Sequence, residues 1–311
     1  MSERREQTVP AELAGQRFDK ALARMFPEYS RSRLQDWIAR GLVTLDGRRP
    51  KTREAVRGGE RVVVEPRAEP AVTSAPEAIP LRILLENEAF LVLDKPAGLV
   101  VHPGAGNLRG TLVNGLLHHA PELEALPRAG LVHRLDKDTS GVLLVAKTLE
   151  AHTELVRLMS QRAITRRYLA VCHGVLTGGG TIDAPIGRHP VDRLRMAVRE
   201  DGKPAVTRYR VLRRFRAHTY ISVELETGRT HQIRVHFAWR RHPLVGDPLY
   251  GRRHTIPAGA DERLRKVLEG FRRQALHAAR LEFEWAGEKI VAEAPLPVDF
   301  QELLAALEAA G

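Results

Sequence analysis

The chain has 311 residues, of which 43% are hydrophobic and 28% charged, and its formal net charge is +11. This composition is typical of a globular protein with a buried core, and every apolar run is shorter than the ~20 residues that a membrane span requires. A single cysteine, Cys172, excludes an internal disulfide and a cysteine-based zinc site, and we expect it to be a small buried residue. Because the N-terminus is polar and carries no apolar leader, these properties predict a cytoplasmic protein without a membrane segment.

The basic excess is concentrated in one part of the chain. Residues 161–254 carry 19 Lys and Arg against 7 Asp and Glu, whereas residues 1–66 carry 14 against 10. A basic surface of this kind attracts polyanions, so the clustering favours nucleic acid as a partner.

Residues 12–65 predict a small domain of their own, with two helices and a short β part. The second helix is expected to begin after Ser30 as its N-cap and to end at Gly41, and strands are expected over 43–45 and 61–64. The residues expected to face inward on the two helices are Phe18, Leu22, Met25, Leu34, Trp37 and Ile38.

The polar face of the second helix is basic. Its expected members are Arg31, Arg33, Gln35 and Arg40. This domain resembles the S4 RNA-binding domain through the strings YSRSRL at 29–34 and GLVTLDG at 41–47. The resemblance implies that the three arginines bind RNA; the alternative is an ordinary solvated helix face.

A linker is predicted over residues 66–80. This stretch contains four prolines among Ala, Glu, Ser and Thr and has no apolar periodicity. Such a composition is typical of an extended tether, so we expect the first domain to move relative to the rest of the chain.

Residues 81–297 alternate β-type runs with helical patterns, which predicts an α+β domain with a mixed, largely antiparallel sheet flanked by helices. Strands are expected over 90–93, 141–146, 168–171 and 221–225, helices over 149–162 and 230–240, and an inserted loop with a short helix over 252–273. Residues 298–311 predict a last helix, which Asp299 and Glu302 would open as a capping box.

A polar cluster precedes the expected strand at 141–146. Residues 133–141 read HRLDKDTSG, and active-site groups favour such loops on rigid scaffolds, although a charged surface turn is the more usual case. The string DTSG at 138–141 also resembles the aspartic protease signature. That chemistry needs a second matched carboxylate, and no second Asp-Thr-Gly or Asp-Ser-Gly occurs.

Several motifs in order resemble those of the RluA family of pseudouridine synthases, and the resemblance spans nearly the whole chain. Besides HRLDKDTSG, the matching strings are LDKPAGLVVHP at 93–103, RRYLA at 166–170, LETGRTHQIRVH at 225–236, GDPLYG at 246–251 and QALHA at 274–278. One departure is Arg166, where the family commonly has Lys. The resemblance implies isomerisation of uridine to pseudouridine, with neither cofactor nor metal.

The resemblance also assigns catalytic roles to three residues. Asp136 would be the catalytic carboxylate, acting either by attack on the sugar or by removal of a neighbouring proton. Arg234 would offset the desolvation of Asp136. Tyr168 would stack under the base and help to remove the C5 proton, for which a cation such as Arg166, Arg167 or Arg234 would have to lower its pKa.

Further arginines are expected to bind RNA. A structured uridine must leave the stack to reach an enzyme, and the planar guanidinium of Arg134 would fill its place. Arg166, Arg167 and Arg229 would contact the RNA beside it. We expect His231 and His236 to have hydrogen-bonding or packing roles, because their spacing is poor for one metal ion.

The resemblance implies a monomer that acts on large-subunit (23S) ribosomal RNA. The alternatives are transfer RNA as the substrate, a non-catalytic RNA-binding or ribosome-assembly factor, and a hydrolytic base glycosylase. Which uridines are modified, and whether naked RNA or an assembled subunit is recognised, does not follow from the sequence.

Overall fold

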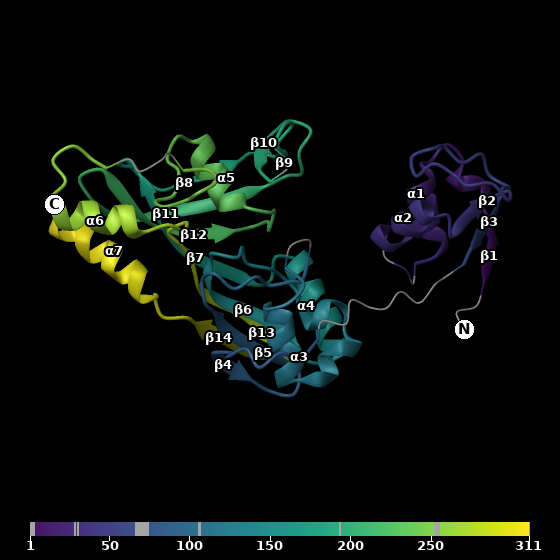
Figure 1. Ribbon diagram of the computed structural model, residues 1–311, viewed down its shortest axis with the longest axis horizontal. Helices are drawn as coiled ribbons and strands as arrows, with labels where there is room; N and C mark the ends of the chain where they lie inside the picture. The colour runs from purple at the N-terminus through teal and green to yellow at the C-terminus, as the bar shows by residue number, and fades with distance from the viewer. Residues whose placement is uncertain are drawn as a thin grey trace. The chain divides into compact units, whose positions relative to one another are not determined.

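A computed structural model describes residues 4–27, 29, 31–65, 75–104, 107–192, 194–251 and 256–310, without the side chains of residues 31–33. The chain forms two compact units, Met1–Thr73 and Ser74–Gly311 (Figure 1). No helix in the described ranges is long and apolar enough to cross a bilayer.

The N-terminal unit packs two helices against a three-stranded antiparallel sheet. Its elements are β1 (Arg5–Thr8), η1 (Ala11–Leu13), α1 (Phe18–Met25), α2 (Arg31–Arg40), β2 (Val43–Leu45) and β3 (Arg61–Val64), and the strand order is β1-β3-β2. The six expected inward residues are all buried, which confirms both helices. Strand β1 was not predicted, because all four of its residues are exposed and show no apolar alternation.

One expectation for α2 is wrong. Gln35 does not extend into solvent with the arginines; its side-chain amide donates to the buried carboxylate of Asp19 at 2.6 Å. Asp19 also accepts two hydrogen bonds from Arg17. Ser30, the expected N-cap, lies outside the described residues.

The described part of the C-terminal unit contains a nine-stranded sheet. The strands in spatial order are β4 (Ile83–Glu86), β5 (Phe90–Lys95), β6 (Ser140–Ala146), β13 (Leu276–Trp285), β7 (Thr165–His173), β12 (His218–Leu225), β11 (Val206–Arg214) and β8 (Gly180–Asp183), with β14 (Glu288–Glu293) paired to β13. Only the central β6–β13 pair is parallel among these pairings, so the predicted mixed, largely antiparallel sheet is confirmed. A separate hairpin joins β9 (Ile186–Arg188) and β10 (Met196–Val198).

Helices cover both faces of this sheet. They are α3 (Leu112–His119), η2 (Pro121–Ala125), η3 (Pro127–Gly130), α4 (Leu149–Ser160), α5 (Gln232–Trp239), α6 (Glu262–Gly270) and α7 (Val298–Ala309). Strands β5 and β6 are buried on both sides, since alternate residues point to a core under α3 and to a second core under α4. Their continuous apolar runs follow from this double burial.

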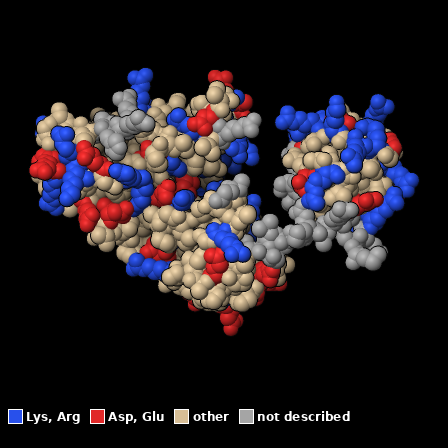
Figure 2. Space-filling view, in the orientation of Figure 1, with Lys and Arg blue, Asp and Glu red and all other residues tan. Residues whose placement is uncertain are grey.

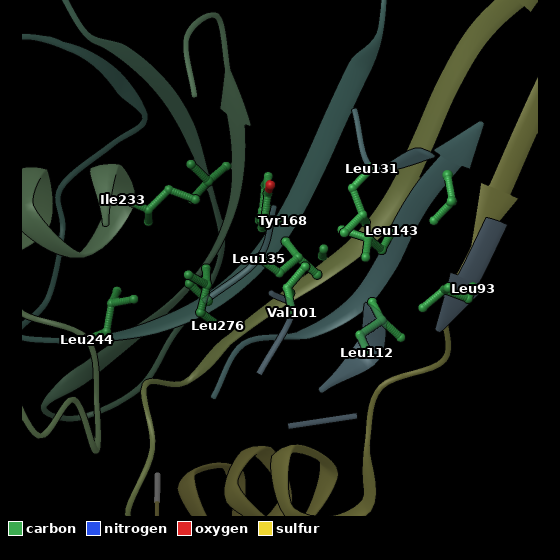
Figure 3. Close-up of a cluster of buried hydrophobic side chains, with 14 of the residues drawn as sticks. Leu93, Val101, Leu112, Leu131, Leu135, Leu143, Tyr168, Ile233, Leu244 and Leu276 are labelled. Atoms are coloured by element: carbon green, nitrogen blue, oxygen red, sulfur yellow. The ribbon is translucent and has the colours of Figure 1, made fainter. Parts of the chain in front are cut away.

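Strand β7 contributes to the same core as α3 and α5. Tyr168, Ala170 and Cys172 lie on one face of β7, as the two-residue period of a strand requires, and pack with Ile233 and Phe237 of α5. Figure 3 shows Tyr168 in this cluster together with Leu135 and Leu276. The expectation that Cys172 is buried is confirmed.

Two helix starts differ from the sequence predictions. Helix α5 begins at Gln232, because His231 has a left-handed backbone (φ 56°, ψ 22°). Helix α7 starts after Pro297 without a side-chain cap, so the predicted capping box is wrong; Asp299 instead accepts two hydrogen bonds from Arg273.

Only the end of the predicted linker is described. Residues 66–74 lie outside the described ranges, whereas the Ala75 carbonyl accepts from the side-chain amide of Asn114 in α3 (2.8 Å) and the Glu77 N–H donates to the Asn114 carbonyl (3.0 Å). Residues 75–80 therefore pack on the C-terminal unit. The limits 12–65, 81–297 and 298–311 remain predictions.

Candidate active site

A cavity of about 1110 Å³ opens in the C-terminal unit. Its walls come from residues 100–104 after β5, from residues 131–137 and Thr139 before β6, from the start of β7, from residues 225–234, which lead into α5, and from Leu276 of β13. The topology therefore brings together five of the motifs that are far apart in the sequence.

The loop that carries Asp136 is anchored in the core. Leu131 and Leu135 are buried beside Leu143 of β6 and Tyr168 of β7 (Figure 3). Asp136 follows Leu135 directly, so its carboxylate lies at the boundary between this core and the cavity, with 16% of its side chain exposed. A loop held by apolar anchors can present one polar group at a fixed position.

Lys95, at the end of β5, fixes the next residue of the loop. Its ammonium group is fully buried and donates to the carbonyls of Pro96 (2.7 Å), Leu99 (3.0 Å) and Lys137 (2.9 Å). Burial lowers the pKa of Lys95 to about 8, and Asp138 and Asp136 oppose that shift.

The segment at the start of β13 fixes the rest of the loop. Arg273 donates to the Asp138 carbonyl (3.3 Å), Gln274 donates to the Thr139 hydroxyl (2.9 Å), and the Ser140 hydroxyl lies 2.9 Å from Nδ1 of His277. At Gly141 a Cβ atom would lie 2.1 Å from the Ala278 carbonyl oxygen, so β6 and β13 can pair here only with glycine.

Arg234 links Asp136 to a second, more deeply buried carboxylate. Its Nη1 donates to Oδ2 of Asp136 at 2.9 Å, while Nε and Nη2 donate to the two oxygens of Asp247 at 2.7 and 2.9 Å. Burial opposes the charge of Arg234, but the hydrogen bonds and charges of Asp247 and Asp136 outweigh it and raise the pKa of Arg234 above its ordinary value. The predicted contact between Arg234 and Asp136 is thus present, and Asp247 holds the guanidinium from behind.

Tyr168 lies on the same cavity wall as Asp136. Of the three cations named as candidates to lower its pKa, Arg166 does so but does not determine the net shift. Burial raises the pKa of Tyr168, and Asp136 adds to that shift, whereas Arg166 opposes it without overcoming it. Tyr168 is therefore a neutral phenol at neutral pH in this structure.

Residues 89–239 match the profile of RNA pseudouridylate synthases, and residues 16–62 match that of the S4 domain. A protein of Xanthomonas campestris pv. campestris named ribosomal large subunit pseudouridine synthase D is 58% identical over 97% of this chain and 92% of its own length. Proteins of that name from Pseudomonas aeruginosa and Escherichia coli O157:H7 are 54% and 51% identical, over 96% and 97% of this chain and 94% of their own lengths. The chain belongs to the RNA pseudouridylate synthases.

Solved structures agree with this membership. Human RNA pseudouridylate synthase domain containing 4 has a TM-score of 0.58 and 27% identity over 73% of this chain and 93% of its own. Human RNA pseudouridylate synthase domain containing 1 has a TM-score of 0.56 and 28% identity, over 71% of this chain and 85% of its own. The resemblance to the RluA family and to S4 domains is confirmed, which makes the chain an enzyme rather than an assembly factor.

The arginines expected to bind RNA fall into two groups in this synthase. Arg134, Arg166 and Arg229 line the cavity. Arg167 does not, because neighbouring residues of β7 point to opposite faces of the sheet; it pairs with Glu224 of β12 instead. In the S4 domain Arg40 lies 3.2 Å from Asp36, and the side chains of Arg31 and Arg33 lie outside the described part. Figure 2 shows basic side chains over much of the visible face of this domain.

Other residues of the synthase site had no predicted role. They are Lys95, Asp247, Tyr250, Arg273 and Gln274. Each lies in or beside one of the family motifs, and that position was the only signal in the sequence. Apart from local contacts, the partners of these residues lie between 13 and 135 positions away along the chain. No local sequence pattern identifies pairs so far apart.

The two histidines of the third motif make hydrogen bonds, as expected. His236 is buried and contacts the Thr207 hydroxyl and the Ala184 carbonyl, both at 2.9 Å. His231 lies 2.8 Å from the Tyr250 hydroxyl and faces the cavity.

Proposed function

We propose that this enzyme converts uridine to pseudouridine in large-subunit (23S) ribosomal RNA, with Asp136 as its catalytic carboxylate. The substrate is supported by the names of the relatives, which match along nearly the whole chain. The observation that carries the catalytic assignment is the Asp136 carboxylate, held by Arg234 at 2.9 Å on the wall of a cavity that also contains Tyr168.

The reaction breaks the C1′–N1 bond of uridine, turns the base, and joins C5 to C1′. The base loses its C5 proton and gains one at N1, so atoms balance without a redox step, and no cofactor or metal is required. Cleavage leaves an electron-poor sugar. Asp136 either attacks that sugar or removes a neighbouring proton, and the hydrogen bond from Arg234 orients its carboxylate for both routes.

Tyr168 would form the surface under the base. Its ring is buried against the core, and its position beside Asp136 suits stacking with a uracil that has left its helix. Because its phenol is neutral in the free protein, removal of the C5 proton by Tyr168 would require a change in its surroundings that lowers this pKa, since the negative charge of RNA by itself would raise it further.

Arg134, Arg166 and Arg229 would contact the RNA around the displaced uridine. Arg134 is exposed beside Asp136, which suits stacking in the vacated position. Arg166 has a buried Nε without a hydrogen-bond partner among the described residues, which favours a phosphate or base as its missing acceptor. Arg31, Arg33 and Arg40 would bind RNA outside the cavity, and Arg167 could contact it only from the other face of β7.

A cytoplasmic location follows from ribosomal RNA as the substrate. A monomer is part of this proposal, as the family resemblance implies.

The experiment is to map pseudouridine by carbodiimide labelling and primer extension in ribosomal and transfer RNA from cells that lack the protein. Complementation uses the wild type, Asp136→Asn, and Asp201→Asn as a control at an exposed carboxylate outside the cavity lining. We expect a set of large-subunit sites to be lost, and to be restored by the wild type and the control alone. Loss confined to transfer RNA would overturn the substrate, and restoration by Asp136→Asn would overturn the catalytic assignment.

A further inference from the structure

His231 lies between two groups of the site. Its Nδ1 is 2.8 Å from the hydroxyl of Tyr250, and its Nε2 is 3.8 Å from Oδ1 of Asp136. Arg234 already holds the other oxygen of Asp136, Oδ2. The two carboxylate oxygens therefore face two different nitrogen groups.

The backbone of His231 is unusual for a residue with a side chain. It has a left-handed conformation, which non-glycine residues rarely adopt and which tends to occur at functional sites. His231 is the N-cap of α5, where its carbonyl accepts from the Val235 N–H at 2.9 Å. Its ring makes an edge-on contact with that of Tyr250, with 5.6 Å between the centroids.

The hydrogen bonds around Tyr250 favour one tautomer of His231. The Tyr250 hydroxyl accepts a hydrogen bond from the backbone N–H of Met196 at 2.8 Å. Its own proton is then free to be donated to Nδ1 of His231. Burial lowers the pKa of His231, with Asp136 opposing, so the imidazole is neutral and carries one proton. If Tyr250 donates to Nδ1, that proton lies on Nε2, the atom that faces Asp136.

We propose that His231 is a positioning residue for the isomerisation: it holds Oδ1 of Asp136 through its Nε2–H, in the tautomer that Tyr250 selects. This inference rests on the proposed role of Asp136. At 3.8 Å the contact is electrostatic, and a movement of somewhat under ~1 Å on RNA binding would make it a hydrogen bond. With both oxygens held, the carboxylate cannot rotate away from the sugar carbon on which it acts.

The test combines a spectroscopic measurement with kinetics on the full-length protein. Nitrogen-15 NMR of the imidazoles identifies the tautomer of His231, whose signal is assigned by its absence in His231→Asn. Asn suits this backbone, because it tolerates the left-handed region. In Tyr250→Phe the ring under the Arg234 guanidinium, 5.1 Å from its centroid, is retained and only the hydroxyl is removed. His118→Gln, on the exposed side of α3, serves as the control.

We expect the Nε2–H tautomer in the wild type and a shift toward Nδ1–H in Tyr250→Phe. In His231→Asn and Tyr250→Phe the single-turnover rate constant on a ribosomal RNA stem-loop should fall by about 10- to 100-fold. The Kd for that RNA should stay within about 2-fold of the wild-type value. Folding is checked by circular dichroism and Tm, and the control should match the wild type.

A wild-type His231 protonated on Nδ1 would overturn the proposal, as would full kcat in both site variants. In either case an inactive Asp136→Asn variant would still support Asp136 as the catalytic carboxylate, and only the role of His231 would be lost. Activity in Asp136→Asn would instead remove the proposed function itself, so the two failures are distinguishable.

Discussion

Two parts of the cavity use arginine in opposite ways. We call its buried part, with Asp136, Tyr168 and Arg234, the floor, and its outer part, with Arg134 and Arg166, the rim. On the floor, Arg234 is buried and uses three nitrogens on two carboxylates. On the rim, Arg134 and Arg166 make no ion pair with any carboxylate of the described ranges. The buried charge of Arg234 is balanced by two carboxylates and orients Asp136, whereas Arg134 and Arg166 have no such pair in the described part of the chain and are expected to donate to RNA. The contacts of Arg234 are thus present in the free protein, and those of Arg134 and Arg166 are expected to form with the substrate.

The carboxylate of Asp247 provides the strongest test of the prebuilt floor. Asp247→Asn removes the buried charge behind Arg234, and breaking such a pair costs on the order of 3 kcal/mol in the free energy of unfolding. Turnover should fall as well, because Arg234 loses its orientation toward Asp136. Urea denaturation compares this variant with Asp201→Asn, which should behave like the wild type. Equal stability of the two variants would mean that Asp247 does not support the floor.

Tyr168→Phe tests whether the floor takes part in chemistry or only packs. The variant keeps the ring that would stack under the base and removes the hydroxyl, so RNA binding should persist while single-turnover rate falls by roughly 100-fold. Tyr209→Phe, on β11 and outside the cavity lining, controls for loss of a tyrosine hydroxyl. Full activity of Tyr168→Phe would reduce Tyr168 to a packing residue.

Arg134→Ala tests the rim. Turnover on a uridine within a stem-loop should fall by roughly 10-fold more than on an unstructured oligonucleotide of the same length. Only in the stem-loop does the displaced uridine leave a gap between stacked bases for the Arg134 guanidinium to fill. Arg210→Ala removes an exposed arginine of β11 that does not line the cavity. Equal losses on the two RNAs would leave Arg134 as a general phosphate contact.

The motif strings predicted Asp136, Arg234 and Tyr168 as neighbours, and the structure places all three on one cavity. The two-residue period of β7 already implied that Arg166 and Arg167 cannot share a face, so that distinction was available from the sequence. The raised pKa of Tyr168 could not be predicted from the sequence, because it depends on how deeply the folded chain buries the ring.

The contacts that hold the floor could not be predicted either. Arg234 with Asp247, and Gln274 with Thr139, join residues whose proximity arises only from the parallel pairing of β6 and β13 and from the loop after α5. Similarly, nothing local indicated that His231 would leave the helical conformation and so shorten α5.

The contacts that hold the Asp136 loop also determine when, during synthesis, the site can form. Thr139 and Ser140 depend on Gln274 and His277, which are 135 and 137 residues later in the chain. Contacts of such long range form late, since the intervening chain must first be made and closed. A nascent chain that ends before residue 273 therefore contains Asp136 but not the strand that fixes its loop. We expect such a chain to be inactive until roughly the last 40 residues have been made and folded.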